Sequence, residues 1–142
     1  MFSICVHGYA TQESLNYWSF ILFHWVPEQV YLMRPDTGLV TNEKIFVEAL
    51  VIETASDLPA DQPLVMLSPV VAKYLPGDIP LPEFTYPENP IFMFGSNRMH
   101  LSQDDLGTRV PDYSVYIPGQ SPDLYDFMAG AVVLYDQASR NG

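Results

Sequence analysis

The fold is decided by two stretches of the chain, IFMFGSN at residues 91–97 and VYIPGQSPDLYDFMAGAVVLYDQ at residues 115–137. In the first, four consecutive apolar residues stop at Gly95, a pattern typical of a buried strand that ends in a turn. In the second, the apolar run at residues 115–117 ends at Pro118 in the same way. The sequence therefore predicts two buried strands, each followed by a tight turn.

A helix is predicted directly after the second turn. Ser121, Pro122 and Asp123 stand in the order of a helix start, with a hydroxyl cap, a proline in the first turn and an acid near the positive end of the helix dipole. Apolar residues then recur at spacings of three and four, which predicts one apolar helical face. That face comprises Leu124, Phe127, Met128, Ala131, Val132 and Tyr135. The small residues 129–131 allow this helix to pack closely.

The rest of the chain alternates strand-like and helix-like segments. Buried strands are predicted at residues 2–6, 30–33 and 64–67, and a helix from Thr11 to Trp25. One side of that helix carries Leu15, Trp18, Ser19, Leu22 and Trp25. Residues 46–52 fit a strand as well as a helix that begins near Asn42, and periodicity does not separate the two. Residues 75–90 carry five prolines, so no regular element is predicted there.

Strands that alternate with helices predict an α/β fold with a mainly parallel sheet and helices on both faces. A chain of 142 residues is expected to form a single domain around one core. In such sheets ligands bind beyond the carboxyl ends of the strands. Ser68, Gly95 and Pro118 all follow predicted strands, so we expect their turns to converge on one pocket.

The composition limits the classes of function. Six basic residues face 17 acidic ones, and the resulting charge of −11 disfavours autonomous RNA binding because phosphate backbones repel such a surface. No apolar run reaches the length of a membrane span, and the N-terminus lacks the features of a signal peptide. The lone Cys5 is expected to be buried and reduced in a cytoplasmic protein. The histidines show no metal-ligand spacing, so no metal site is expected.

Several polar and aromatic residues have a structural and a functional interpretation. His7, at the end of the first strand, is interpreted as a hydrogen-bonded turn histidine, with catalysis as the alternative. The acids at residues 104–105, 123 and 126 are interpreted as solvated or helix-start residues rather than paired catalytic carboxylates. Phe20, Phe23 and Trp25 are interpreted as core or dimer contacts rather than as a platform on which bases stack.

The series strand–turn, strand–turn–helix resembles the C-terminal motifs of the SPOUT methyltransferases, specifically the ribose-methylating SpoU-like branch. In that family one strand ends in a Gly-Ser/Asn-Glu turn, a second ends in Ile-Pro, and Ser-Leu-Asn opens a final helix rich in alanine. The counterparts here are residues 94–97, 117–118 and 123–125. A weaker similarity at residues 15–18, 29–32 and 87–90 extends the resemblance over nearly the whole chain.

The resemblance implies a trefoil knot over about residues 91–139, in which the final helix passes under a loop. In the family the knot binds S-adenosylmethionine, mostly through backbone groups. The residues implied to bind the cofactor are Ser68, Gly95, Ser96, Ile117, Pro118 and Leu124. The final helix forms much of the family's homodimer interface, which here places Tyr125 and Tyr135 near a partner subunit.

The chain departs from the family's catalytic pattern. The helix arginine that activates the ribose hydroxyl should lie near residues 22–23, where this chain has Leu22 and Phe23. The motif glutamate is replaced by Asn97, and the asparagine of the third motif by Tyr125. The resemblance leaves two candidate catalytic residues. They are Asn16 and Arg98. Asn16 is the one early polar residue that matches the family's pattern. Arg98 is a cation that would replace the helix arginine from another position, and Arg34 and His100 are alternatives to it.

The sequence thus supports an S-adenosylmethionine-dependent methyltransferase that acts on RNA, at the ribose 2′-O. The alternative is a catalytically inactive knotted homodimer that binds a nucleotide-like ligand or a basic protein partner, which the strong negative charge suits. A third hypothesis is a different α/β enzyme that uses the same pocket for other chemistry.

Overall fold

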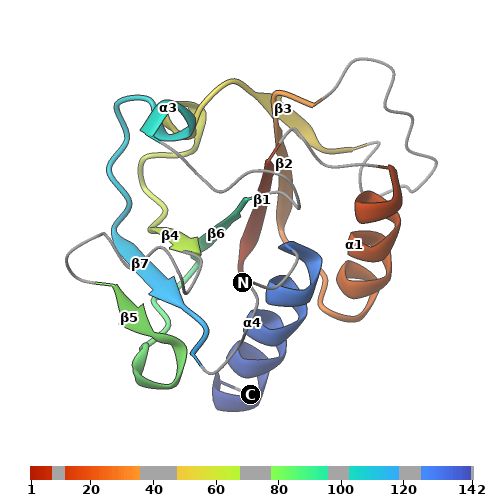
Figure 1. Cartoon of the computed structure of the whole chain (residues 1–142), viewed down its shortest axis with the longest axis vertical. Coiled ribbons are helices and arrows are strands. Elements are labelled where there is room, and N and C mark those ends of the chain that lie inside the picture. The colour runs from red at the N-terminus through yellow and green to blue at the C-terminus, as the bar shows by residue number, and fades with distance from the viewer. Residues whose placement is uncertain (8–11, 36–47, 68–77, 96–102, 119–125, 142) are drawn as a thin grey trace.

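The residues that the structure describes form a seven-stranded sheet in which every strand pair is parallel (Figure 1). The computed structural model describes residues 1–7, 12–35, 48–67, 78–95, 103–118 and 126–141. The strand order is β3-β2-β1-β6-β4-β7-β5. The strands are β1 (Ser3–His7), β2 (Gln29–Met33), β3 (Leu50–Ile52), β4 (Leu64–Leu67), β5 (Ile79–Pro80), β6 (Ile91–Phe94) and β7 (Tyr113–Tyr116). The predicted parallel α/β fold is confirmed.

The central strands are continuous apolar runs because they are buried on both faces. Every residue of β1, β4 and β6 is buried, and β6 lies between the other two, with Ile91 in register with both Ser3 and Leu64. A strand covered on both sides has no solvent face, so the apolar–polar alternation of half-buried strands is absent. This explains why IFMF at residues 91–94 was recognisable as a strand from sequence.

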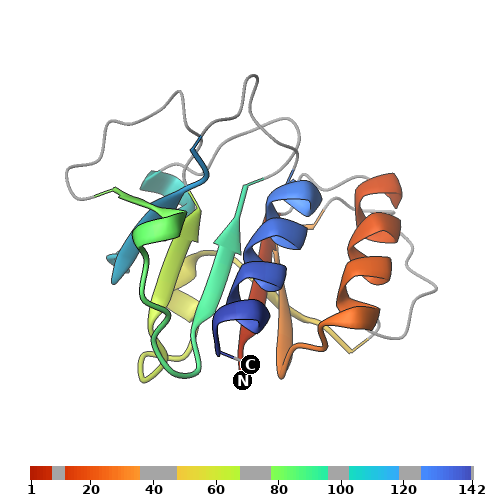
Figure 2. The same cartoon turned by 90° about the horizontal axis from the view of Figure 1, so that it is seen from below.

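Helices cover both faces of the sheet unequally. The two long helices, α1 (Gln12–His24) and α4 (Asp126–Asn141), lie side by side on one face (Figure 2). Their buried side chains form one core cluster with the sheet residues beneath them, including Trp18, Leu134, Phe92 and Phe94. The other face carries the 3₁₀ turn η1 (Ala55–Asp57) and the short helix α3 (Gln103–Leu106), over a second cluster that includes Cys5 and Met93. Within the described ranges no helix is long and apolar enough to cross a membrane.

Most element predictions are confirmed to within a residue or two, one open alternative is decided, and two predictions need correction. The ambiguous segment at residues 46–52 contains the strand β3, and the proline-rich segment forms β5 and the 3₁₀ turn η3 (Leu81–Glu83). Prolines fit there because β5 is an edge strand, which can lack ladder donors. β7 begins and ends earlier than predicted, so Ile117 lies just beyond the strand. The predicted helix start at residues 121–123 lies outside the described residues.

The apolar face predicted for α4 is buried only in part, with Phe127 packed against the core. Met128, Val132 and Tyr135 are exposed, whereas Gly130, Val133 and Leu134 are buried. The physical reason is that α4 packs against α1 as well as the sheet, and Trp18 of α1 occupies the space over Gly130. The small residue therefore faces inward and a group of large apolar residues faces solvent. The expected close packing at residues 129–131 is confirmed at Gly130.

Candidate functional site

The predicted cofactor-binding turns follow strands that lie next to one another. β6 pairs with β4 and β4 pairs with β7, all parallel, so these three strands end at the same edge of the sheet. Gly95 follows the fully buried Phe94 at the end of β6, and Ile117 follows β7. Because a parallel sheet leaves unpaired backbone groups where its strands end, this edge can supply backbone donors and acceptors to a ligand.

The described members of the predicted cofactor set differ in exposure. Gly95 is half-buried, Ile117 is half-buried against the core on the α1 and α4 side of the sheet, and Pro118 is exposed. Ser68, Ser96 and Leu124 lie outside the described residues. The structure thus brings Gly95, Ile117 and Pro118 to one edge of the sheet, and their binding of a cofactor stays a prediction.

The two candidate catalytic residues stay predictions. Asn16 is exposed on α1, and Arg98 lies outside the described residues. The position of the family's helix arginine is occupied by Leu22, which is fully buried in the core, and by Phe23, which is exposed. Neither apolar side chain can orient a hydroxyl through a hydrogen bond or a charge.

A buried polar cluster at the same edge of the sheet was missed by the sequence analysis. His7, the last residue of β1, and Asp105 of α3 are 2% and 3% exposed. Nε2 of His7 lies 3.0 Å from Oδ1 of Asp105, and Nη2 of Arg34 donates a hydrogen bond to the same oxygen. Asp105 was interpreted as a solvated or helix-start acid. It does lie in the first turn of α3, but it is not solvated, because the fold buries this carboxylate between His7 and Arg34. The expected hydrogen bonding of His7 is confirmed.

The charge of Asp105 also acts on the thiol of Cys5. The Cys5 thiol, two residues before His7 on β1, has its pKa raised to about 12, first by complete burial and then by the charge of Asp105. Both effects disfavour the thiolate. Cys5 is therefore a buried core residue, as predicted from its position, and not a nucleophile.

Arg34 has an unusual backbone. Its φ is +47°, in the left-handed region that residues with a Cβ rarely adopt. Its backbone N–H donates to the carbonyl of Ile52 at 2.9 Å, which ties the end of β2 to the end of β3. Its side chain is 36% exposed. Such strain persists where the surrounding structure enforces it and is concentrated at functional sites.

A second buried acid lies at the first turn of α4. Ser14 donates to both carboxylate oxygens of Asp126, at 3.3 and 3.2 Å, and Nε1 of Trp18 donates to Oδ2 at 2.9 Å. Burial raises the pKa of Asp126, and the bonds from Trp18, the backbone and Ser14 oppose that rise. This helix-start acid therefore joins α4 to α1.

Two other arginines within the described residues have structural partners. Arg109 donates to the carbonyls of Leu58, Pro59 and Gln62, just before β4 begins. Arg140 donates to Asp136 and to the carbonyl of Leu81, near the C-terminal end of α4. Among the described residues, no group of three His, Cys, Asp or Glu side chains is placed to hold a metal ion.

Comparison with known proteins identifies the fold. No family model and no curated protein sequence matches the chain. Among solved structures, TrmJ from Z. mobilis ZM4 superposes with a TM-score of 0.71 at 16% identity, over 98% of this chain and 69% of that one. The SpoU methyltransferase AviRb from Streptomyces viridochromogenes, solved in complex with AdoMet, gives 0.73 at 14% identity, over 98% and 60%. A structure that concerns 2-OH methylation on tRNA gives 0.73 at 15% identity, over 99% and 91%.

These similarities establish that the chain has the fold of the SpoU-like, or SPOUT, methyltransferases. The resemblance found in residues 91–137 is confirmed at the level of the fold.

Proposed function

We propose that this protein binds S-adenosylmethionine at the carboxyl edge of β4, β6 and β7 and transfers its methyl group to RNA. The observation that carries the proposal is the adjacency of these three strand ends, with Gly95 and Ile117 at two of them, in a SpoU-like fold. The SpoU methyltransferase AviRb, which shares this fold, was solved with AdoMet. The trefoil knot around this edge is part of the proposal.

The residues present suit a cofactor that is held through the backbone. Gly95 removes side-chain bulk just where the buried β6 ends, and the strand ends offer peptide groups. Ile117, packed against the core, supplies an apolar wall. Backbone recognition does not depend on the polar side chains that this chain lacks. The bound cofactor would supply an electrophilic methyl group on a sulfonium.

The 2′-hydroxyl of ribose is the proposed acceptor. One structural neighbour concerns 2-OH methylation on tRNA, and a ribose hydroxyl is present at every RNA nucleotide. A hydroxyl nucleophile needs orientation and removal of its proton. Asn16 and Arg98 remain the sequence-based candidates for orientation, because Leu22 and Phe23 cannot act in that way.

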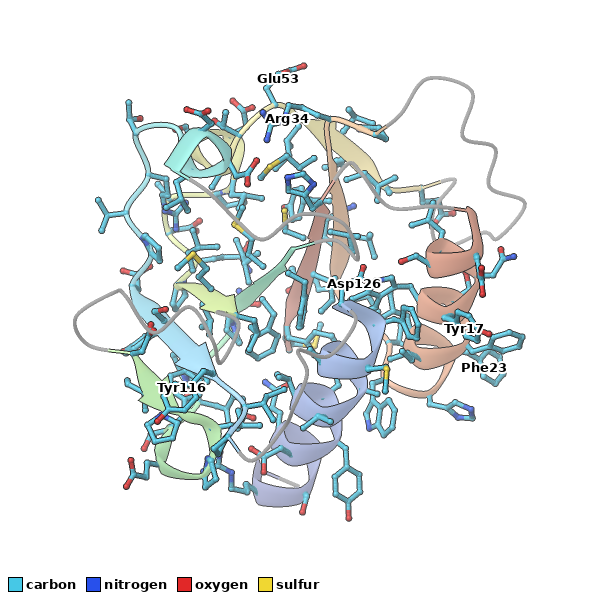
Figure 3. All side chains as sticks on the ribbon, viewed as in Figure 1. Tyr17, Phe23, Arg34, Glu53, Tyr116 and Asp126 are labelled. Atoms are coloured by element: carbon cyan, nitrogen blue, oxygen red, sulfur yellow. The ribbon has the colours of Figure 1, made fainter. Side chains whose placement is uncertain are left out.

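We also propose that the protein is a homodimer. Large apolar side chains are exposed along the two long helices, a surface that we call the α1–α4 apolar face. It comprises Tyr17, Phe20, Phe23, Met128, Val132 and Tyr135. Figure 3 shows Tyr17 and Phe23 projecting from α1, and Tyr17 stacks on Phe127 of α4 with ring centroids 4.7 Å apart. Large apolar side chains exposed on neighbouring helices are typical of an interface, and a second copy of the chain would cover them.

Calorimetric titration with S-adenosylmethionine and S-adenosylhomocysteine tests the cofactor site. We expect both to bind the wild type and Gly95→Trp to abolish binding, whereas Ala138→Trp, with the same bulk near the exposed C-terminal end of α4, leaves it unchanged. Failure of both ligands to bind the wild type would refute the proposal.

Transfer is tested with radiolabelled S-adenosylmethionine and an unmodified tRNA transcript. Methylation of the 2′-O protects the adjacent phosphodiester from alkaline cleavage, so the label should appear in alkali-resistant dinucleotides. Label recovered in mononucleotides would place the methyl group on a base. Cofactor binding without any transfer would favour the inactive knotted dimer.

A further inference from the structure

We propose that Arg34, positioned by Asp105 and His7, contacts a phosphate of the RNA substrate at the carboxyl edge of the sheet. The inference rests on the proposed function. It assigns an RNA contact to a residue that lies outside the cofactor-binding strand ends, in a chain whose net charge opposes RNA binding.

Three separate elements bring this cluster together. His7 ends β1, and its register partner Met33 ends β2, so that Arg34 is the first residue beyond β2. Asp105 comes from α3, which covers the face of the sheet opposite α1 and α4. His7 and Arg34 both bind Oδ1 of Asp105. A carboxylate buried to this extent needs such partners, and it therefore holds the guanidinium of Arg34 in one place.

The guanidinium keeps donors for a ligand. Within the described residues its side-chain hydrogen bonds are all made by Nη2, to Asp105 and to the sulfur of Met33. Arginine has five N–H donors in a planar fork that matches phosphate oxygens. With about a third of the side chain exposed, Nε and Nη1 can face a ligand while Nη2 stays on Asp105.

The backbone of Arg34 is consistent with a group that is held in place. The left-handed φ of +47° is unfavourable for arginine, and the bond from its N–H to Ile52 maintains it. An arginine whose side chain was free in solvent would have no contact to offset the energetic cost of this backbone conformation.

Position distinguishes Arg34 from the other arginines that the structure describes. The guanidinium of Arg109 donates hydrogen bonds to backbone carbonyls near the amino end of β4. Arg140 lies near the C-terminal end of α4, which Figure 2 shows at the level of the chain's N-terminus and so at the amino ends of the strands. Arg34 lies at the opposite, carboxyl edge. Its strand β2 is two places from β6, which at about 4.8 Å per strand puts it about 10 Å along the edge from the Gly95 turn.

Acidic residues near Arg34 allow the effect of net charge to be separated from the effect of Arg34's orientation. Glu53 is exposed and follows Ile52, and Figure 3 shows Glu53 and Arg34 near each other at this edge. Asp104 is also exposed, whereas Asp57 accepts bonds from the backbone of residues 53 and 54. If net charge alone governed binding, removal of any acid would strengthen RNA binding. Removal of Asp105 should instead weaken it, because Arg34 would lose its orientation.

The test is fluorescence anisotropy of the full chain with a labelled unmodified tRNA transcript over a range of KCl concentrations. We expect Arg34→Gln to weaken binding about tenfold, the scale of one charge-assisted hydrogen bond, and to reduce the salt slope by about one. Arg140→Gln makes the same change in net charge and should leave the slope unchanged. Glu53→Gln should tighten binding and Asp105→Asn should weaken it. Arg34→Lys should be intermediate, because lysine keeps the charge and loses the fork.

Several results would overturn the proposal. They are equal effects of Arg34→Gln and Arg140→Gln, tighter binding by Asp105→Asn, and a wild type that does not bind the transcript at low salt. Thermal denaturation shows whether Asp105→Asn folds. If it does not fold, the comparison of Arg34→Gln with Arg140→Gln tests the proposal by itself. Calorimetry with S-adenosylmethionine separates the two proposals. Cofactor binding without RNA binding refutes the role of Arg34 and leaves the cofactor site, whereas loss of both refutes both.

Discussion

Replacement of Gly130 by alanine tests how α4 is packed against α1. A Cβ at this position would lie 2.2 Å from Cη2 and 2.5 Å from Cζ3 of Trp18. The Trp18 ring is fully buried, its Nε1 donates to Asp126 at 2.9 Å, and its ring packs edge-on against Phe94 with centroids 5.1 Å apart. The ring therefore cannot move away without the loss of contacts on two other sides.

Two opposing effects set the magnitude. Overpacking of a core position costs about 1–3 kcal/mol, and alanine favours a helix over glycine by about 1 kcal/mol. Both predicted contacts are far inside the optimal carbon–carbon separation of about 3.5–4 Å, and the ring is anchored, so the packing term should prevail. The two terms differ by about 0–2 kcal/mol. Because the contacts are so short and the ring is anchored, we expect the upper half of that range, a fall of about 1–2 kcal/mol in the free energy of unfolding. At roughly 4 °C per kcal/mol, Tm should fall by about 4–8 °C.

Urea unfolding followed by circular dichroism measures the effect, in the wild type and in a Trp18→Phe background. Phenylalanine lacks the outer ring atoms that the new Cβ would meet. In that background Gly130→Ala should be neutral or stabilising, and the double-mutant cycle should show coupling between the two positions. An equal loss of stability in both backgrounds, or a gain in the wild type, would refute the assignment of the clash to Trp18.

Three further outcomes follow from the structure. Because burial raises the pKa of Asp126 above its ordinary value of 3.8, the folded state holds this proton more tightly than the unfolded state, and the carboxyl's contribution to stability declines as pH rises from about 4 through the raised pKa. Chemical denaturation across pH should thus show the wild type losing stability relative to Asp126→Asn as pH rises; a difference independent of pH would contradict this. The Cys5 thiol, with its pKa raised to about 12, should react with a disulfide reagent at pH 8 after denaturation and hardly at all in the folded protein, and rapid labelling of the folded chain would show that the burial is wrong. In sedimentation equilibrium, Phe23→Glu should convert a dimer to monomer, whereas Val110→Glu, at a position exposed to the same degree (79% and 78%) and away from the α1–α4 apolar face, should not; a monomeric wild type would refute the dimer.

Much of the fold could be predicted from sequence because its signals are local. A run such as residues 91–94, apolar without alternation, is what a strand buried on both faces requires, and a helix such as α1 repeats its buried residues at spacings that one turn dictates. Strands that alternate with helices then imply parallel pairing. The resemblance to the SpoU-like motifs used the same local features, the turn at Gly95 and the Ile117-Pro118 strand end.

The candidate site could be predicted in part. The edge at which the turns converge follows from parallel strands, because every such strand ends on the same side. The adjacency of β6, β4 and β7 along that edge follows from the strand order, which no local pattern contains. The family's helix arginine is expected near residues 22–23, where this chain has apolar residues. Arg34 was one of three cations that the sequence offered in its place, but no local pattern shows that Asp105 holds it.

Tertiary structure alone decided which polar groups are buried and which apolar groups are exposed. His7 and Asp105 are 98 positions apart and Ser14 and Asp126 are 112 apart, so neither acid's burial is visible in its own neighbourhood. The side of α4 that faces the core was likewise set by a residue of another helix, Trp18, whose ring packs against Gly130. The sequence by itself determined the elements and their parallel arrangement, since these depend on short-range periodicity. The buried charges and the exposed helix face depend on partners that are distant in sequence, and only the folded chain brings those partners together.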